Sequence, residues 1–350
     1  MKQKMKNLLK KLYLKNHLSH EDLLYILDNI NYKSSEILCS YAQRTVEKTY
    51  HNKIYLRALL EFSNYCKNKC RYCGINNNNK KVSRFRLTAE EILESCKAAY
   101  EQGYRTFVLQ SGEDDFYKRR LINIIENIKF KFSNAAITLS IGEYSYQYYK
   151  KLYEAGADRF LLRHETISKN LYNNLHPNMN YENRFNCLKK LKKIGYQVGA
   201  GFIVGLPGQT NRILASDLIF LKRFNPDMIG IGPLIPHPET PLAECNTGSV
   251  KKTTILLALL RLLLPKTLLP VTTAVNTLDK KGWEKGIKAG ANVIMPVVSP
   301  ASVRDNYEIY QNKKNTDVFL LDIIKDRVEK IGYKVDMGRG DSLNYIRKSR

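Results

Sequence analysis

Three cysteines in one short stretch, CKNKCRYC, are the clearest chemical feature of this sequence. Cys66, Cys70 and Cys73 have the spacing CxxxCxxC, and the other cysteines are scattered along the chain. Three thiolates can hold three irons of a [4Fe–4S] cube and leave the fourth iron open to a substrate or cofactor. The spacing therefore predicts an iron–sulfur centre with a chemical task.

Two alternative roles for these cysteines stay open at this point. A structural zinc site usually has four Cys or His ligands, and no histidine lies between His51 and His164. Zinc would thus need a distant fourth ligand. The second alternative is a set of buried thiols that bind no metal.

Composition indicates a globular chain with a basic surface. Hydrophobic residues make up 43% of the 350 residues, and 57 Lys and Arg against 33 Asp and Glu give a net charge of +24. The basic residues are spread along the chain, so a solvated surface is favoured over a nucleic-acid interface, although such a surface attracts anionic ligands. The scattered cysteines, seven in all, argue against a disulfide framework. We expect a cytoplasmic protein without a membrane span, because the opening segment lacks an apolar core and the run 255–265 is short and contains Arg261.

A scaffold of alternating strands and helices would place the cysteine loop at the end of a strand, and the sequence shows this alternation. Amphipathic segments end near Gly103, Gly156, Gly195 and Gly290, each before an apolar run. The pattern predicts a (β/α)8 TIM-type barrel with its chemistry at the carboxyl ends of the strands, and an open doubly wound sheet is the alternative. The expected strands are residues 54–63, 106–111, 136–142, 159–165, 198–205, 228–236, 270–275 and 291–298.

Three regions are expected along the chain. Residues 1–50 form an N-terminal helical extension, with a capping signal at Ser19 and Asp22. Residues 51–310 form the barrel, in which Thr88 and Glu91 make a second capping box and residues 255–265 a buried helix. Residues 311–350 contribute a last helix and a basic tail.

The cysteine motif resembles the signature of the radical S-adenosylmethionine (SAM) superfamily, whose members build a βα barrel with this loop after the first strand. Between about residues 54 and 310, further stretches resemble the HydE family of [FeFe]-hydrogenase maturases within that superfamily. Biotin synthase and methylornithine synthase share the architecture. The stretches are EFSNYCKNKCRYCGINNNN, FVLQSGEDDFY, LLRHET, GYQVGAGFIVGLPGQT, DMIGIGPLIPHPETPLAE, PVTTAV and GANVIMP.

This resemblance implies two cofactors. One [4Fe–4S] cluster would be held by Cys66, Cys70 and Cys73, and SAM would bind its open iron and be cleaved to methionine and a 5′-deoxyadenosyl radical. Some relatives carry a second cluster near the C-terminus, but the last cysteine here is Cys245, so no second cluster is expected.

The resemblance also assigns residues to SAM. Tyr72 would pack near adenine, the SGED turn would approach the amino group, and Arg184 would pair with the carboxylate. The alternatives are an ordinary half-buried tyrosine at position 72, a salt bridge between Glu165 and Arg184 that supports the rim, and a core isoleucine at position 231. The full expected set is Tyr72, Gln110, Ser111, Gly112, Glu113, Ser140, Glu165, Arg184, Gly205 and Ile231.

A substrate site is implied inside the barrel. Arg163 would hold an anionic, carboxylate-bearing substrate, and the rest of the cavity would be formed by Thr272, Thr273, Met295, Tyr307 and Tyr310. The glycine-rich stretch 201–210 is not a nucleoside-triphosphate loop, because no GK[ST] follows it.

The implied function is assembly of the di-iron subcluster of [FeFe]-hydrogenase. The substrate would be a cysteine-bound iron complex, supplied by the tyrosine-cleaving radical SAM maturase, and the product would pass to the scaffold GTPase maturase. Two alternatives remain: an enzyme of the methylornithine synthase kind that makes a small amino acid, and a basic RNA-binding or RNA-modifying protein.

Overall fold

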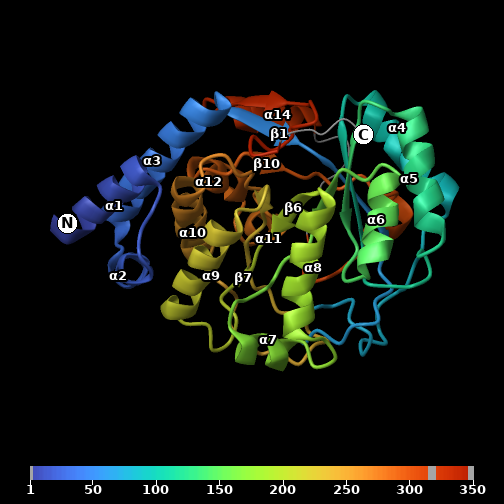
Figure 1. Cartoon of the computed structure of the whole chain (residues 1–350), viewed down its shortest axis with the longest axis horizontal. Helices are drawn as coiled ribbons and strands as arrows, with labels where there is room; N and C mark the ends of the chain where they lie inside the picture. Colours follow the sequence, from blue (N-terminus) through green and yellow to red (C-terminus); the bar gives the residue numbers. More distant parts are fainter. Residues whose placement is uncertain (1–2, 314–320, 346–350) are drawn as a thin grey trace.

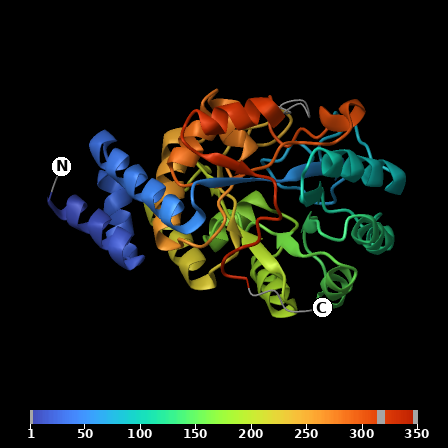
Figure 2. The same cartoon turned by 90° about the horizontal axis from the view of Figure 1, so that it is seen from above.

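Parallel strands form a barrel at the centre of the molecule, and helices surround it (Figures 1 and 2). The computed structural model describes residues 3–313 and 321–345. One sheet has the order β2-β3-β4-β5-β6-β8, with every pairing parallel. The strands are β1 (Lys53–Leu56), β2 (Ala58–Ser63), β3 (Thr106–Ser111), β4 (Ala136–Ser140), β5 (Arg159–Leu161), β6 (Gln197–Ala200), β7 (Ile203–Val204), β8 (Met228–Ile229), β9 (Gly232–Pro233), β10 (Val293–Ile294) and β11 (Lys334–Asp336).

Short parallel bridges close the ring on its remaining side. Met228 pairs with Leu268, and Pro270 pairs with Val293 of β10, which in turn pairs with β1. A further bridge joins Leu59 of β2 to Val297. The expected (β/α)8 barrel with an N-terminal helical extension is therefore confirmed, and the open sheet is excluded.

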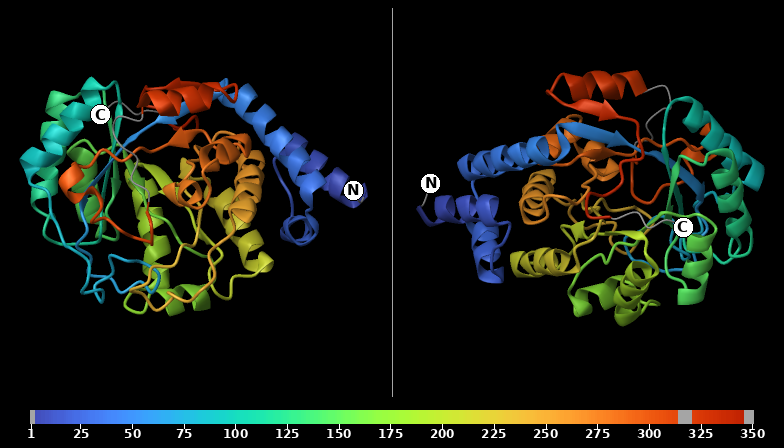
Figure 3. Two further views of the ribbon diagram at one scale, coloured as in Figure 1. Left: turned by 180° about the vertical axis from the view of Figure 1, so that it is seen from behind. Right: turned by 45° about the horizontal axis from the view of Figure 1, so that its top comes forward.

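Helices cover the outside of the ring, as Figure 2 shows. The first three lie to one side of the barrel, where α3 packs against α10 (Figure 3). No helix in the described part of the chain combines the length and apolar character of a membrane span. The helices are α1 (Gln3–Lys15), α2 (His20–Asn29), α3 (Tyr32–Tyr50), α4 (Ala89–Glu101), α5 (Arg120–Lys131), α6 (Tyr146–Glu154), α7 (Lys169–Leu175), α8 (Tyr181–Ile194), α9 (Asn211–Phe224), α10 (Val250–Leu263), α11 (Thr273–Leu278), α12 (Gly282–Lys288), α13 (Ala301–Arg304) and α14 (Leu321–Glu329).

Local signals start and stop these helices as the sequence predicts. Ser19 caps α2 by accepting a hydrogen bond from the Asp22 amide, and Thr88 forms a reciprocal capping box with Glu91 at the start of α4. Gly195 ends α8 with a φ of 112°, a left-handed conformation that favours glycine. Helix α10 is buried on all sides from Ile255 to Leu263, as expected for the apolar run 255–265.

Four expected strands are split or replaced in the structure. Residues 54–63 are split at the buried Arg57 into β1 and β2, and 198–205 and 228–236 each form two short strands. Residues 270–275 pair only at Pro270 and become α11 from Thr273. The β-branched residues there favour a strand, but tertiary contacts outweigh this preference. The Thr272 hydroxyl donates a hydrogen bond to the Ile231 carbonyl oxygen, and the hydroxyl groups of Thr273 and Tyr310 are hydrogen-bonded to each other.

The C-terminal segment also adds a strand that the sequence did not predict. Strand β11 pairs in parallel with β1, on the opposite side from β10. Its sequence, KVD, is short and polar, so it lacks the apolar alternation by which strands are recognised. After β11 the chain runs across the amino ends of the barrel strands, where the Arg339 carbonyl oxygen accepts a hydrogen bond from Thr106 at the start of β3.

Candidate active site

A cavity of about 330 Å³ lies at the carboxyl ends of the strands. The cysteine loop follows β2 and lies at the opposite end of the molecule from α14 (Figure 1). All but two of the residues assigned from the sequence line this cavity. They are Cys66, Cys70, Tyr72, Cys73, Gln110, Ser111, Gly112, Glu113, Ser140, Arg163, Glu165, Arg184, Thr272, Thr273, Met295, Tyr307 and Tyr310.

The two remaining residues, Gly205 and Ile231, lie outside the lining. Ile231 is fully buried in the main hydrophobic core. Gly205 has a φ of 90°, and a Cβ atom there would lie 2.6 Å from the Cα atom of Gly248. Packing thus accounts for the isoleucine at position 231 and for the glycine at position 205.

Backbone contacts and one arginine hold the cysteine loop in place. The amide of Lys67 donates to the Glu113 carbonyl oxygen at 2.8 Å, and that of Arg71 to the Leu175 carbonyl oxygen at 2.9 Å. The guanidinium of Arg84 donates to four carbonyl oxygens, those of Asn64, Ile75, Asn76 and Asn79. Nothing in the sequence pointed to Arg84, since it lies outside the CxxxCxxC spacing and contacts only backbone atoms of the loop.

The three cysteines are half-buried and free of disulfides. Burial raises the pKa of Cys66, raises that of Cys70 well above its ordinary value, and raises that of Cys73 to about 12. Iron would reverse this effect, because metal coordination deprotonates a thiol. Within the described residues, no three His, Cys, Asp or Glu side chains are grouped so that they could hold a single ion. A cubane does not need that arrangement, because each thiolate binds a different iron.

Gly112 and Gly142 permit close packing beside the loop. A Cβ atom on Gly112 would lie 2.2 Å from the Tyr65 carbonyl oxygen and 2.7 Å from the Cys66 Cβ atom. A Cβ atom on Gly142 would lie 2.2 Å from the carboxylate of Glu113. That carboxylate accepts hydrogen bonds from the side chain of Asn68 at 3.2 Å and from the amide of Glu143 at 2.9 Å. Glu113 therefore joins the cysteine loop to the loop after β4.

Two arginines in the cavity are paired with carboxylates. Arg184 Nε lies 2.8 Å from Glu143 Oε1, and Arg163 Nε lies 3.3 Å from Glu165 Oε1. Burial opposes the charge of Arg184, but the Glu143 carboxylate outweighs it and raises the pKa of Arg184. The rim salt bridge considered for Arg184 thus exists, with Glu143 in place of Glu165. Glu165 Oε2 is buried and has no hydrogen-bond partner among the described residues, so it can accept a bond from a ligand in this cavity.

Glu165 has a strained backbone that its surroundings maintain. Its φ is +66°, which is uncommon for a residue with a side chain. Asp217 of α9 holds the turn from both sides, because its Oδ1 atom lies 3.1 Å from His164 Nε2 and accepts a hydrogen bond of 2.7 Å from the Ile167 amide. Such strain persists only where surrounding contacts fix the conformation, and it is concentrated at functional sites.

Inside the barrel, a buried ion pair faces the residues assigned to substrate. Lys313 Nζ lies 2.6 Å from Glu61 Oε1, and both side chains are almost fully buried. Lys313 also lies over the ring of Tyr307, whose hydroxyl accepts a hydrogen bond from the Gln110 amide at 3.3 Å. This pair was not predicted from the sequence, although a glutamate within the apolar strand β2 is a signal that could have indicated it.

A histidine beside the cysteine loop holds Tyr72 in place. His176 Nδ1 donates to the Tyr172 carbonyl oxygen at 2.8 Å, which leaves Nε2 to accept from the Tyr72 hydroxyl at 3.0 Å. Burial lowers the pKa of His176 to about 4, so the ring is neutral at neutral pH. This hydrogen bond fixes the side chain of Tyr72, which lines the cavity.

Comparisons with known proteins agree with this geometry. The family model of the radical SAM superfamily matches residues 60–221. The chain is 46% identical over 279 residues to the [FeFe] hydrogenase maturase subunit HydE of Thermotoga maritima, which covers 80% of each chain. It is 29% identical over 307 residues to 3-methylornithine synthase of Methanosarcina acetivorans, which covers 86% of each chain.

Among solved structures, methylornithine synthase (PylB) has the same fold. It matches with a TM-score of 0.84 at 27% identity, over 94% of this chain and 97% of the other. The cavity with its three cysteines, the radical SAM match and the identity to HydE all indicate the same assignment. The chain therefore belongs to the HydE family of radical SAM enzymes.

Proposed function

We propose that this enzyme cleaves SAM reductively at one [4Fe–4S] cluster and that it acts in the maturation of [FeFe]-hydrogenase. The name of its Thermotoga maritima relative describes that role for the relative. The observation that carries the proposal is that Cys66, Cys70 and Cys73 line the same cavity as the charged residues Arg163, Glu165 and Arg184.

Different residues of the cavity would bind the cluster and SAM. Cys66, Cys70 and Cys73 would hold the cluster, which, when bound, supplies the electron for cleavage of the sulfonium. Glu165 Oε2 would accept a hydrogen bond from a hydroxyl or ammonium group of SAM, and the guanidinium of Arg184 would face its carboxylate. The buried walls would keep water from the reacting groups.

The part of the cavity inside the barrel would bind an anionic substrate. Arg163 would hold a carboxylate, and the hydroxyl groups of Thr272, Thr273, Tyr307 and Tyr310 would complete its contacts. We propose a cysteine-bound iron complex as the substrate, the tyrosine-cleaving maturase as its supplier and the scaffold GTPase maturase as the acceptor. We also propose a single cluster, because no cysteine follows Cys245, and a cytoplasmic location.

Synthesis of a small amino acid is the second candidate. The similarity to 3-methylornithine synthase, at 29% identity over 86% of both chains, favours it. Incubation with lysine, SAM and reductant separates the two, because a rearranged amino acid would form only in the second case.

The main experiment compares the wild type with Cys70→Ala after anaerobic reconstitution with iron and sulfide. We expect the variant to lose the cluster absorbance and the release of 5′-deoxyadenosine, because a cube with two thiolate ligands is not retained. Cys39→Ala is the matched control, since Cys39 lies on α3, away from the cavity, and it should behave as wild type. Unchanged cleavage by Cys70→Ala would contradict the proposal.

A further inference from the structure

His176 is buried behind the wall of the active-site cavity, next to the cysteine loop. It follows the last residue of α7 and is 1% exposed. Tyr72, Cys70 and Cys73 line the cavity, whereas His176 does not. His176 therefore influences a ligand in this cavity only through a residue that lines it.

Both ring nitrogens of His176 are hydrogen-bonded, and this fixes the ring. Nδ1 donates to the Tyr172 carbonyl oxygen at 2.8 Å, so Nε2 of the neutral ring accepts from the Tyr72 hydroxyl at 3.0 Å. The ring also stacks on that of Tyr172, with 4.2 Å between the centroids and 27° between the planes. It meets the Tyr72 ring edge to face, at 5.5 Å and 84°. Helix α7 thus sets the orientation of His176, and His176 in turn sets the direction of the Tyr72 hydroxyl.

The cysteine loop is attached to the same segment by contacts that do not involve the histidine ring. The Arg71 amide donates to the Leu175 carbonyl oxygen at 2.9 Å, and the Lys69 amide donates to the Asn178 side chain at 3.0 Å. These bonds are independent of the side chain at position 176. Loss of the ring should therefore leave the loop backbone and the three thiols in place.

The side chain of Tyr72 has three different surroundings. Its hydroxyl bonds His176, and no other hydrogen bond of this hydroxyl occurs among the described residues. Its ring packs against a buried apolar cluster that includes Leu171 and Leu234. The rest of the side chain lines the cavity together with the cysteines. A flat aromatic ring at a cavity wall suits a planar heteroaromatic group such as adenine.

We propose that His176 is a positioning residue for the nucleoside part of SAM. By accepting the hydrogen bond of Tyr72, it holds the tyrosine ring in one orientation at the cavity wall, where the ring is ready to pack against adenine. Without this bond, binding of SAM would also have to order the ring, and this cost lowers affinity. The inference rests on the proposed function, because it requires SAM in the cavity. It gives His176 a role in binding and none in the cleavage step.

The test measures SAM affinity by equilibrium dialysis of the anaerobically reconstituted full-length protein without reductant, so that SAM is bound but not cleaved. His176→Phe keeps a flat ring to stack on Tyr172 and removes the acceptor. We expect its Kd for SAM to rise about 5- to 10-fold, since one hydrogen bond is lost. With reductant, KM for SAM should rise by the same factor, while kcat for release of 5′-deoxyadenosine stays within about twofold, because the lost interaction is equal in the ground and transition states.

Further variants separate this role from a general loss of structure. Tyr72→Phe removes the same bond from the other side, and it should weaken SAM binding by the same factor. The double variant should bind no more weakly than either single variant, because both changes remove one shared bond. His176→Gln supplies an amide oxygen at about the place of Nε2, and it should restore most of the affinity.

His20→Phe is the matched control. His20 Nε2 lies 3.0 Å from the Ser216 hydroxyl, but the residue is on α2, away from the cavity, so this variant should bind SAM as the wild type does. Iron content is measured for every variant and should equal that of the wild type. Wild-type affinity in His176→Phe, effects that add in the double variant, or loss of iron from His176→Phe would overturn this inference alone. A wild-type protein that holds its cluster but binds no SAM would overturn the proposed function as well.

Discussion

Among single residues, Gly112 matters beside the cysteines because a side chain at this position would not fit. Gly112 lies where β3 ends, against Tyr65 and Cys66, and its missing Cβ atom is what lets the two segments touch. Its amide also donates to the Ser63 carbonyl oxygen at 3.1 Å. The lack of a Cβ atom at Gly112 thus helps to set the position of the Cys66 thiol.

Gly112→Ala should therefore disturb the cysteine loop. The added methyl group would meet the Tyr65 carbonyl oxygen at 2.2 Å, so the backbone must shift, which costs roughly 1–3 kcal/mol. We expect a lower iron content after reconstitution and a lower free energy of unfolding. Gly230→Ala is the control in the same cavity, because its new atom would lie 3.9 Å from Pro270. Equal iron contents in the two variants would show that close packing at Gly112 is unimportant.

At the scale of elements, α9 fixes the turn that follows β5. Asp217 contacts both His164 and Ile167, so one carboxyl group holds the residues on either side of Glu165. Burial raises the pKa of Asp217, so the position tolerates loss of its charge better than loss of its acceptor atom.

Asp217→Ala and Asp217→Asn should differ for this reason. Alanine leaves a buried amide and a histidine nitrogen without their partner, which costs about 2–4 kcal/mol, whereas asparagine keeps an oxygen in place. We expect the alanine variant to bind SAM more weakly, measured by equilibrium dialysis, because Glu165 is no longer held. The asparagine variant should bind nearly as the wild type does. Equal affinities of the two variants would mean that Asp217 does not position Glu165.

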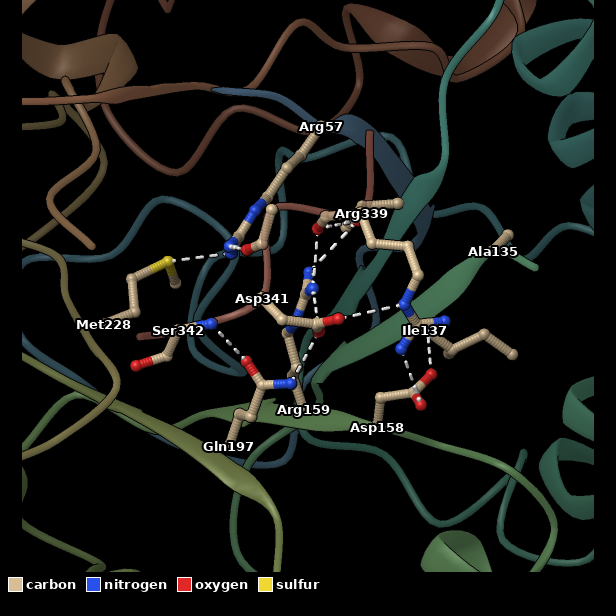
Figure 4. A network of polar contacts seen from close by, with 12 residues as sticks. Arg57, Ala135, Ile137, Asp158, Arg159, Gln197, Met228, Arg339, Asp341 and Ser342 are labelled. Carbon is tan, nitrogen blue, oxygen red and sulfur yellow. Dashed lines mark hydrogen bonds and ion pairs between the residues drawn. The ribbon is translucent and has the colours of Figure 1, made fainter. Parts of the chain in front are cut away.

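At the scale of the whole molecule, the C-terminal segment closes the base of the barrel. Asp341 pairs with Arg159 at 2.6 Å and accepts from the Gln197 side chain at 2.7 Å, so it connects β5 with β6 (Figure 4). Burial alone would raise the pKa of Asp341, but the guanidinium of Arg159 outweighs it and lowers this pKa below its ordinary value.

Asp341→Asn should lower the free energy of unfolding at pH 7. A fully buried pair would lose roughly 3–5 kcal/mol, but Asp341 is 32% exposed, so we expect about 2 kcal/mol. A lowered pKa gives stability that is present above the unfolded value of about 4 and is lost as pH falls below it. Denaturant titrations at pH 7 and pH 3 should therefore show a difference that shrinks in acid.

An exposed pair in the same region provides the control. Asp326 lies 2.6 Å from Lys330 on the surface of α14 and its loop, with side chains 55% and 71% exposed. Asp326→Asn should leave stability unchanged, because water screens such a pair. A pH-independent loss in Asp341→Asn would indicate that its hydrogen bonds matter and its charge does not.

The sequence alone determined the chemistry and the general architecture. The CxxxCxxC spacing, the alternation of apolar runs with helices, and the caps at Ser19, Thr88 and Gly195 are local features, and the structure has the barrel and the caps where they were expected. The roles of the cavity residues and the boundaries at 50 and 310 stay predictions, although the residues themselves lie together.

Which charged side chains pair with one another depends on the tertiary structure. Arg184 faces Glu143, Glu61 faces Lys313, and Arg159 faces Asp341, although the last two residues are 182 positions apart. Helical and strand periodicity says which side of an element is buried, but it does not say which distant group arrives there. Long-range pairing depends on how the barrel closes and where the C-terminal segment crosses its base, and these follow from the packing of the whole chain.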